Sequence, residues 1–593
     1  MRFRPYLVLA VLPVLAATSA SAARAQDAPR VTKVPSSARG DTADPRVNLR
    51  PGWKDAGVAA RGVRLVGHVD RPEGFYNPAD VGDPHYWSSD LAFKGNLVFQ
   101  GSFNGIQVWD ITTPSKPTLK GTLACPGGQG DVSVLGNLLF YSVEETRGRL
   151  DCGGQGVADT VSAERFRGVR IFDITDVAHP KQVAAVQTCR GSHTHTLVPD
   201  PNDPNDVYVF VSGTSVVRSP SELAGCSNAA PDQDPNTSLF RIDVIKVPLS
   251  HPQDARIVAN PRIFAEGGSI AGLQKRDTTD SMHVLSETSR CHDITVYPEI
   301  GLAAGACAGN GLLLDIRDPS APRRVGEVSD PNFSFWHSAT FNNDGTKVLF
   351  TDEWGGGTQP RCRSTDRPQW GADAIFNVNG TTMTMAGYYK LPVAQTSVEN
   401  CVAHNGTLIP VPGRDIMAQG WYQGGMSVFD FTDPAQPKEI AFFDRGPLRG
   451  DSLKVGGFWA AYWYNGHLFG TEMARGLDLL ELTPGPMLSR DEIEAAKLVH
   501  TDVLNPQLQT KIVWPPSFHV ARAYLDQLDR EAGTPRAWST RVRAALGRAE
   551  SLAGAGRRTA LTQLATQLDR DTATVTDSAR VRMLAGAVRD LAR

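Results

Sequence analysis

A short phrase recurs seven times between Gly105 and Glu481: an apolar strand, an acidic or amide residue at its end, and usually a turn that contains proline. The clear copies end at Asp110, Asp173, Asp315 and Asp430, and the weaker copies end at Asp243, Asn377 and Glu481. A repeat of roughly 50 to 70 residues with alternating strand patterns inside each unit is typical of radial β architecture. The sequence therefore predicts an all-β, seven-bladed β-propeller over residues 63–485.

Each repeat can be divided into four strands, but the last one has no convincing fourth strand after Glu481. The segment Val63-Arg-Leu-Val-Gly-His-Val, before the first repeat, has the pattern of such a strand. Open strand edges invite aggregation, and closing a propeller removes them. We therefore expect the N-terminal strand to complete the last blade and close the ring.

The first residues have the features of an export signal. Arg2 and Arg4 precede an apolar run from Tyr6 to Ala17, and small residues follow it. This pattern predicts a signal peptide over residues 1–25. The apolar run is too short for a good membrane span, and no second long apolar stretch follows it. We expect an exported chain without a transmembrane segment, located in the periplasm, on the cell surface or outside the cell.

Composition restricts the partners. The formal net charge of −3 and the pI of about 6.5 provide no basic field for nucleic acid or anionic membrane. Residues 26–62 are polar and contain proline, glycine, serine and aspartate, which predicts a flexible leader. The expected partner is a small molecule or an envelope protein, and no nucleic acid.

The composition changes after the propeller. Residues 486–516 read as a linker with a short helix, where Ser489-Arg-Asp-Glu492 resembles a capping box. The following chain is rich in alanine, leucine and arginine and spaces its apolar residues helically. Gly533-Thr-Pro535 and Gly554-Ala-Gly556 separate three or four helices. We predict a small α-helical accessory domain over residues 517–593 that could dock a partner.

Eight cysteines in an exported protein can all form disulfides. Four of them precede the first strand of a repeat, and the other four follow the second strand. These two places lie on the same rim of an antiparallel blade, because the chain runs out along one strand and back along the next. The predicted pairs are Cys125 with Cys152, Cys189 with Cys226, Cys291 with Cys307, and Cys362 with Cys401.

The first strands of four consecutive repeats share a second pattern: histidine, two residues, threonine and an apolar residue. It begins at His193, His292, His337 and His404. The first strand of each propeller blade is innermost, so the starts of these strands converge on the mouth of the central channel. Imidazole is the commonest metal-binding side chain in proteins. The pattern predicts a transition-metal or ligand site, with copper, zinc and iron as candidate ions.

Carboxylates extend this candidate site. Glu353 and Glu472 end the second strands of their repeats on the same rim, and Glu144 ends close to the corresponding place. A mixed set of histidine and glutamate can bind a metal and leave a position open for substrate. His195 is a further ligand or a partner of one, whereas Asp293 alternates to the other strand face. The candidate metal ligands are therefore His193, His195, His292, His337, His404, Glu353 and Glu472.

A structural role is the alternative for these histidines. Propellers of the WD type often place a histidine before the first strand of each blade, where it hydrogen-bonds within the blade, and Trp109-Asp110 matches that signature. Such a residue should recur in nearly every repeat. The first and second repeats instead have Ser89 and Gly130 near this place, and the seventh has an aromatic stretch. Use on one arc of the ring favours a site.

The strand phrases resemble a known family. Gly168-Val-Arg-Ile-Phe-Asp-Ile-Thr-Asp and Gly425-Met-Ser-Val-Phe-Asp-Phe-Thr-Asp-Pro are similar to the repeats of bacterial LVIVD-repeat β-propeller proteins. This resemblance covers about residues 63–485 and implies the fold, because that family is largely without an assigned activity and propellers have many functions. Ser192-His-Thr-His-Thr-Leu197 resembles the selenium-binding protein and methanethiol oxidase propellers, which would imply a copper-dependent thiol oxidase. No motif of that family matches residue by residue, so no catalytic residue is transferred.

Two functions are compatible with these observations. The first is a metal-binding propeller that acts as an extracytoplasmic metal-dependent oxidoreductase. The second is a non-catalytic envelope or surface scaffold that binds proteins or small ligands through the propeller face and the helical tail.

Overall fold

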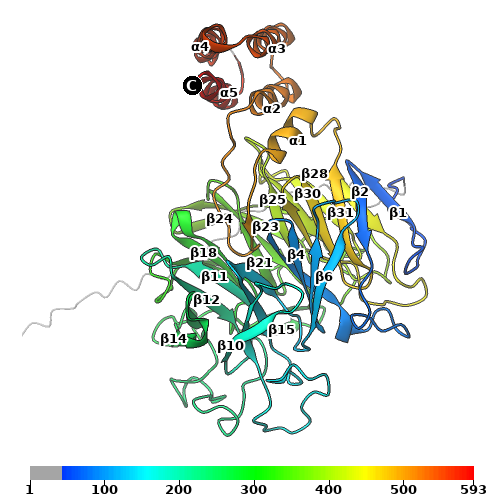
Figure 1. Cartoon of the computed structure of the whole chain (residues 1–593), viewed down its shortest axis with the longest axis vertical. Helices are drawn as coiled ribbons and strands as arrows, with labels where there is room; N and C mark the ends of the chain where they lie inside the picture. The colour runs from blue at the N-terminus through cyan, green and yellow to red at the C-terminus, as the bar shows by residue number, and fades with distance from the viewer. Residues whose placement is uncertain (1–42, 574) are drawn as a thin grey trace, which may run out of the picture. The chain divides into compact units, whose positions relative to one another are not determined.

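The structure, a computed structural model, describes residues 43–573 and 575–593, so the predicted signal peptide and the first part of the leader lie outside the described residues. The described chain is mostly β, with successive sheets in chain order and helices near the C-terminal end (Figure 1). None of the helices in this part of the chain has the length and apolar character needed to cross a membrane.

Each of the seven repeats contributes strands to a four-stranded antiparallel unit. The first strands are β3 (Ser88–Lys94), β7 (Val132–Leu135), β11 (Thr194–Pro199), β17 (Ile294–Tyr297), β21 (Trp336–Phe341), β25 (Asn405–Ile409) and β29 (Phe458–Tyr464). The second strands are β4 (Leu97–Ser102), β8 (Leu138–Val143), β12 (Asp206–Ser212), β18 (Leu302–Cys307), β22 (Lys347–Asp352), β26 (Ile416–Gly420) and β30 (His467–Glu472).

The repeated phrase forms the third strand in most units. The third strands are β5 (Gly105–Asp110), β9 (Gly168–Asp173), β13 (Asp243–Pro248), β19 (Asn310–Asp315), β23 (Asp373–Asn379), β27 (Met426–Asp430) and β31 (Gly476–Leu482). The fourth strands are β6 (Thr118–Ala124), β10 (Lys181–Gln187), β14 (Arg256–Ala259), β20 (Arg323–Val328), β24 (Thr382–Tyr389), β28 (Lys438–Arg445) and, from the N-terminal side, β2 (Val63–Val69). A small hairpin, β15 (Asp277–Asp280) with β16 (His283–Leu285), lies between the third and fourth units.

The third repeat differs from the prediction. Its copy of the phrase was expected to end at Asp243, but β13 begins there and runs to Pro248. Val244, Ile245 and Val247 are almost completely buried, whereas Leu239 is only half-buried. The buried apolar residues after Asp243 therefore determine the position of this strand.

The two ends of the sheet-forming chain meet in the last unit. β2 pairs antiparallel with β31, from Val63 opposite Leu482 to Val69 opposite Leu477. β1 (Val58–Arg61), which belongs to the segment expected to be a flexible leader, pairs with β28. β25 and β29 pair in parallel, which joins the sixth and seventh units into one nine-stranded sheet.

Apolar side chains fill the space between neighbouring units. One buried cluster combines Phe140 of the second unit with Val209 of the third. Another combines the first unit with the seventh, where the ring of Phe93 lies 4.6 Å from that of Tyr464 and 5.0 Å from that of Phe469. The first strands of successive units also contact one another, and β29 contacts β3. The arrangement is that of a β-propeller-like protein, as the sequence predicts.

Residues 499–514, which we call the strap, run along the far ends of the first strands. β32 (Val503–Leu504) of the strap pairs with the end of β3. The Asn505 side chain accepts from the Val134 N–H and donates to the Val134 carbonyl, both at 2.8 Å. The Gln509 side chain makes the same two bonds with Phe341, at 2.7 and 3.0 Å. Side-chain amides of the strap thus satisfy backbone groups that no neighbouring strand reaches.

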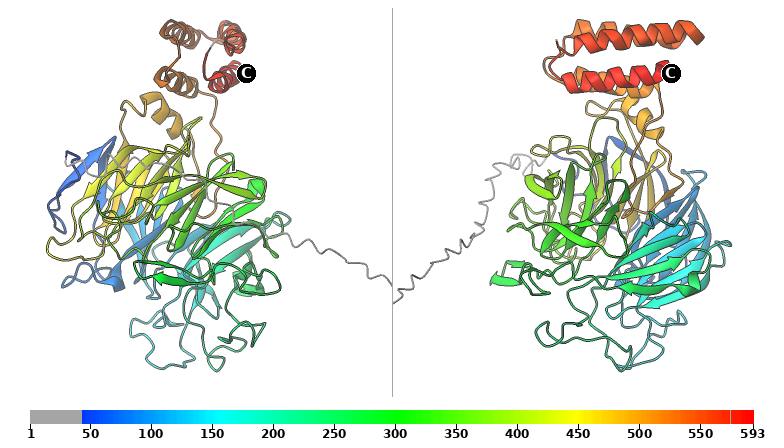
Figure 2. Two further views of the ribbon diagram at one scale, coloured as in Figure 1. Left: turned by 180° about the vertical axis from the view of Figure 1, so that it is seen from behind. Right: turned by 90° about the vertical axis from the view of Figure 1, so that its left-hand side faces the viewer.

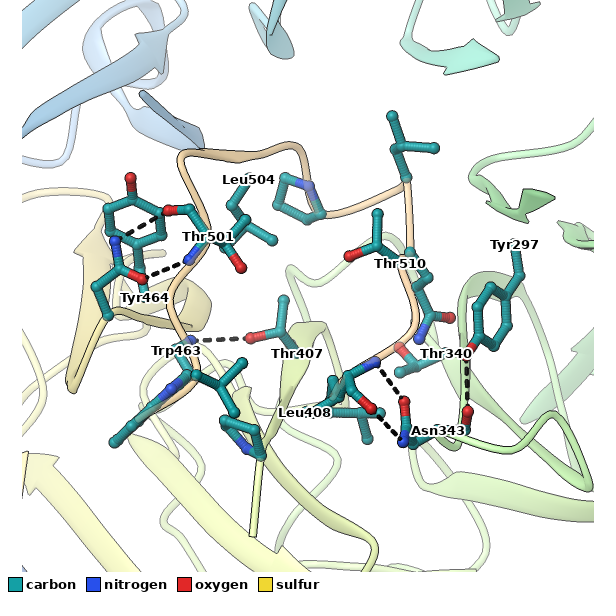
Figure 3. A pocket seen from close by; sticks show the side chains of 18 residues that line it. Tyr297, Thr340, Asn343, Thr407, Leu408, Trp463, Tyr464, Thr501, Leu504 and Thr510 are labelled. Atoms are coloured by element: carbon teal, nitrogen blue, oxygen red, sulfur yellow. Dashed lines mark hydrogen bonds between the residues drawn. The ribbon is translucent and has the colours of Figure 1, made fainter. Parts of the chain in front are cut away.

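The strap encloses a small cavity of about 90 Å³ (Figure 3). Trp463, Thr407 and Asn343 line its propeller side, and Leu504 and Thr510 line the strap side. Asn343 also accepts a hydrogen bond from the backbone N–H of Ile512, at 2.7 Å. The strap therefore covers the ends of the first strands that lie away from the histidines.

The C-terminal part is helical, and four helices of the predicted accessory segment run side by side (Figure 2). α1 (Arg490–Lys497) begins with the predicted capping box, in which Ser489 and Glu492 bond each other's backbone N–H. The following helices are α2 (Phe518–Arg530), α3 (Arg536–Ser551), α4 (Gly554–Asp571) and α5 (Ser578–Ala592). Their core includes Leu525, Leu546, Leu568 and Leu584. This agrees with the helical spacing in the sequence.

Candidate metal centre

The four histidines of the repeated pattern form a continuous row across the third to sixth units. Each lies at or just before the start of its first strand. The ring centroids are 4.2 Å apart for His193 and His292, 3.9 Å for His292 and His337, and 4.2 Å for His337 and His404. His292, His337 and His404 are buried, and His193 is partly exposed. The structure therefore brings together the side chains that the pattern singled out.

The threonines of the same pattern have a different role. The Thr196 hydroxyl donates to the Ile294 carbonyl at 2.5 Å, and the Thr295 hydroxyl donates to the Ala339 carbonyl at 2.8 Å. Both bonds join the first strands of neighbouring units. The threonine half of the pattern thus fixes the spacing of the strands, and with it the spacing of the histidines.

Two histidines of this row and Glu353 lie close enough together to hold a metal ion. One ligand atom each from His292, His337 and Glu353 lies within 4.8 Å of the others. Glu353 directly follows β22, and its carboxylate oxygens lie 3.8 Å from His337 Nε2 and 3.7 Å from His404 Nε2. Neither of these Nε2 atoms has a hydrogen-bond partner among the described residues. Buried polar atoms are normally paired, so two orphaned imidazole nitrogens beside a carboxylate indicate a binding site.

The first two histidines of the row approach each other most closely. His193 Nε2 and His292 Nε2 are 2.5 Å apart. Two neutral imidazoles can tolerate this approach only if one nitrogen donates a proton to the other, because two N–H groups or two lone pairs repel. A cation in the place of that proton would contact both nitrogens.

The Nδ1 atoms of three of these histidines contact polar groups of the protein. The Nδ1 contacts join His193 to the Glu144 carboxylate at 2.7 Å, His292 to the Asp293 carboxylate at 3.0 Å, and His404 to the Trp459 carbonyl. In metal sites such partners fix the tautomer and ring orientation of a histidine ligand. Here they leave Nε2 as the ligand atom of these three rings.

Burial controls the charge of the row. It lowers the pKa of His292 and His337 well below the usual range, and neighbouring imidazoles add to this effect. Burial also lowers the pKa of His404 to about 3. For His193, burial is outweighed by the charge and hydrogen bond of Glu144, which raise the pKa. Three of the four imidazoles are therefore neutral at neutral pH, which is the form that binds metals.

Glu353 and Tyr422 form a pair at the bottom of the site. Burial raises the pKa of Glu353 to about 7, and the Tyr422 hydroxyl donates to its Oε1 at 2.5 Å. Tyr422 is held closely: a Cβ added at Gly457 would lie 2.0 Å from its carbonyl carbon, and one at Gly357 would lie 2.3 Å from its phenol ring. Both glycines have positive φ angles. Side chains at these positions would displace Tyr422 from Glu353.

Two predicted ligands do not join the row. The buried His195 ring bonds through Nδ1 to the Ser142 hydroxyl, at 2.8 Å, and lies 3.1 Å from an Asp131 oxygen. The Glu472 carboxylate accepts hydrogen bonds from the N–H groups of Gly457 and Ala474, and from the Arg475 guanidinium and backbone. The oxygens of Glu472 are therefore occupied by donors that fold the following loop. The positions of His195 and Glu472 in their repeats placed them on the histidine rim but did not reveal these hydrogen-bond partners.

Tyr422 and Trp459 were not among the predicted site residues. Tyr422 follows β26 as Glu353 follows β22, so aligning all second-strand ends would have found it. Trp459 occupies the start of the first strand of the seventh unit, where four other units have histidine. Asp293 was expected on the other strand face, and its carboxylate contacts the Nδ1 side of the His292 ring. No sequence pattern indicated that role.

A cavity of about 500 Å³ opens above the row. His193, His292 and Glu353 form part of its wall. The aromatic side chains that line it are Trp87, Phe103, Phe335, Tyr422 and Trp459. Cavities of this size accommodate small organic ligands. The row therefore has access to a space in which a substrate can bind.

Disulfides secure the loops of this rim. The structure contains Cys125–Cys152, Cys189–Cys226, Cys291–Cys307 and Cys362–Cys401, the same four pairs that the positions within the repeats predict. No cysteine remains free in the described chain, which contains all eight. Such a set is typical of proteins outside the cytoplasm.

No protein-family model matches the chain, and no curated protein matches its sequence. Solved structures with a similar fold include the periplasmic gluconolactonase of Pseudomonas aeruginosa, at 13% identity and a TM-score of 0.39, covering 67% of this chain and 99% of that one. A functionally unknown protein from Desulfotomaculum acetoxidans matches at 10% identity and a TM-score of 0.35, covering 61% of this chain and 90% of that one. Similarity at this level carries no inference about activity.

Proposed function

We propose that this protein is an exported metal-dependent oxidoreductase built on a seven-bladed β-propeller of the LVIVD-repeat type. The successive contacts of the first strands and the pairing of β2 with β31 support a ring closed by the N-terminal strand. The basic and apolar N-terminal sequence and the four disulfides support export.

The metal site in this proposal is the histidine row. His292, His337 and Glu353 are the central ligands, and His193 and His404 flank them. The observation that carries the proposal is the burial of His337 Nε2 and His404 Nε2 without partners beside a carboxylate. Leaving polar atoms unpaired in a protein interior is costly, and a cation would satisfy them together.

The ligand set favours a first-row transition metal. Imidazole suits copper, iron and zinc, and a single carboxylate fits any of the three. A bound copper or iron ion would supply the electron-transfer chemistry of an oxidoreductase. The protein's own residues hold the ligands and, at Glu353, can hold or release a proton near neutral pH because burial raises the pKa of this carboxyl to about 7.

Elemental analysis of protein purified without an affinity tag tests the proposal. We expect a near-stoichiometric amount of copper, iron or zinc in the wild type and its loss in the His292→Ala/His337→Ala double variant. His179→Ala is the matched control, because His179 is exposed and bonds only to Asp176 at 2.9 Å. Circular dichroism must show that the double variant is folded. A wild type that takes up none of the three metals after loading would contradict the proposal and favour the non-catalytic scaffold.

A further inference from the structure

Three buried hydrogen-bond donors in the wall of the 500 Å³ cavity have no acceptor. Among the described side chains that line it, the buried atoms without a partner are Gln129 Nε2, Arg290 Nε and Trp459 Nε1. All three are N–H donors. Buried donors without acceptors are costly, and a ligand that provides acceptors would satisfy them.

Arg290 is the most informative of the three. It lies one residue before Cys291 and two before His292, and it is half-buried. The described chain offers its guanidinium no carboxylate within ion-pair distance and no hydrogen bond. Its nearest aromatic contact is Phe335, with 6.0 Å between the guanidinium carbon and the ring centroid. The carboxylates of Glu287 and Glu144 act on this guanidinium only at longer range. A half-buried guanidinium without a bonded carboxylate favours an anionic ligand.

Two other arginines show a contrast with Arg290. Arg218 bonds Glu222 at 2.6 Å, and Arg475 bonds Glu472 at 2.8 Å. In both cases the protein itself supplies the counter-charge. Arg290 lines the cavity without a bonded carboxylate, two residues before His292. An anion bound by Arg290 would therefore lie in the same cavity as His292.

Aromatic side chains in the cavity wall favour a ligand with a flat apolar part. The rings of Trp87 and Phe103 meet edge to face at 5.5 Å, and those of Phe103 and Trp459 at 6.0 Å. These three aromatic side chains line the same cavity. Flat apolar groups pack well against such surfaces.

We propose that the substrate is a small organic acid: its anionic group pairs with Arg290, its other oxygens accept from Gln129 and Trp459, and its flat apolar part packs on the aromatic wall. This inference rests on the proposed function, because it names the substrate class of the same metal site. The anion pocket itself is built from residues outside the metal ligands, so the two can be tested separately.

Binding of organic acids and their neutral amides to chelator-treated protein tests the inference. The probes are benzoate, phenylacetate and succinate, each compared with its amide by isothermal titration calorimetry. We expect at least one acid to bind the wild type about tenfold or more tightly than its amide, because charge-assisted hydrogen bonds are the stronger ones. Arg290→Gln should remove this preference and leave amide binding unchanged.

The control variant is Arg256→Gln, because Arg256 is exposed and lies on the fourth strand of the third unit. It should retain the full preference for the acid. Equal binding of all three acids and their amides to the wild type would overturn the inference, as would an undiminished preference in Arg290→Gln.

The outcomes also separate this inference from the proposed function. If the wild type contains metal but shows no preference for acids, the proposed substrate class is wrong and the proposed metal site stands. A preference that depends on Arg290 in a protein that takes up no metal would retain the anion pocket and contradict the oxidoreductase. Arg290→Gln should keep the metal content of the wild type, which excludes general damage to the rim.

Discussion

The two ends of the first strands are built from the same repeats but differ in how their polar groups are satisfied. At the far ends, the strap supplies Asn505 and Gln509 as partners for backbone groups, and only a cavity of about 90 Å³ remains. At the near ends, His337 Nε2 and His404 Nε2 have no partner, and a cavity of about 500 Å³ is lined by the neighbouring His193, His292 and Glu353. The repeats thus provide a scaffold at both ends, and the unsatisfied end is the candidate site.

Removing the strap's amides should produce the largest effect. Asn505→Ala/Gln509→Ala leaves four backbone groups of Val134 and Phe341 without partners, which we expect to lower the free energy of unfolding by about 3–6 kcal/mol. Urea unfolding measures this change. The matched control is Asn202→Ala/Gln253→Ala, because both residues are exposed. The metal content should not change, and a double variant as stable as the control would show that the strap does not stabilise the propeller.

A substitution in the histidine row should instead weaken metal binding. We expect His337→Ala to weaken metal binding by at least about 100-fold, because it removes a central ligand. Competition with a chelator of known affinity measures the change, and His179→Ala serves again as the control. Unaltered affinity in His337→Ala would mean that the row is structural.

The disulfides allow a comparison within the histidine rim. Removing Cys291–Cys307 by serine substitution should cost about 2–4 kcal/mol of stability and also weaken metal binding about tenfold, because Cys291 is adjacent to His292. Removing Cys125–Cys152 should lower the stability by a similar amount without changing the metal affinity, because neither cysteine adjoins a histidine of the row. Thermal unfolding and chelator competition provide the two readouts. Equal metal affinities in the two variants would show that Cys291–Cys307 does not position the metal ligands.

The smallest expected effect is on pH dependence. Burial raises the pKa of Glu353 to about 7, so below this pH a metal must displace a proton from the carboxyl. His292 and His337 have lowered pKa values and stay neutral in this range, whereas the raised pKa of His193 adds a second displaced proton. Each proton lowers the affinity about tenfold per pH unit. Glu353→Gln should reduce the slope by an amount that grows from about one half at pH 7 toward one at lower pH, and an unchanged slope would exclude Glu353 as a ligand.

Local repetition explains what the sequence could predict. The phrase, the histidine pattern and the cysteine positions recur at fixed places in the repeats, so they indicated the four-stranded units, the row His193, His292, His337 and His404, and the disulfide pairs. Contacts that occur in only one repeat have no recurring sequence pattern that could predict them. Donors around Glu472 and the bond from Tyr422 to Glu353 depend on loop conformation. The strap lies far along the chain from the strands it covers, and its Asn505 and Gln509 have no distinctive pattern.

X-ray absorption at the edge of the bound metal tests the central claim most directly, because it identifies the ligands. The account predicts nitrogen or oxygen ligands at about 2.0–2.1 Å, with outer-shell scattering from at least three imidazoles in the wild type. One imidazole should be lost in His337→Ala, whereas Asn505→Ala/Gln509→Ala should give the wild-type spectrum. A metal without imidazole ligands, or a spectrum unchanged in His337→Ala, would contradict the account.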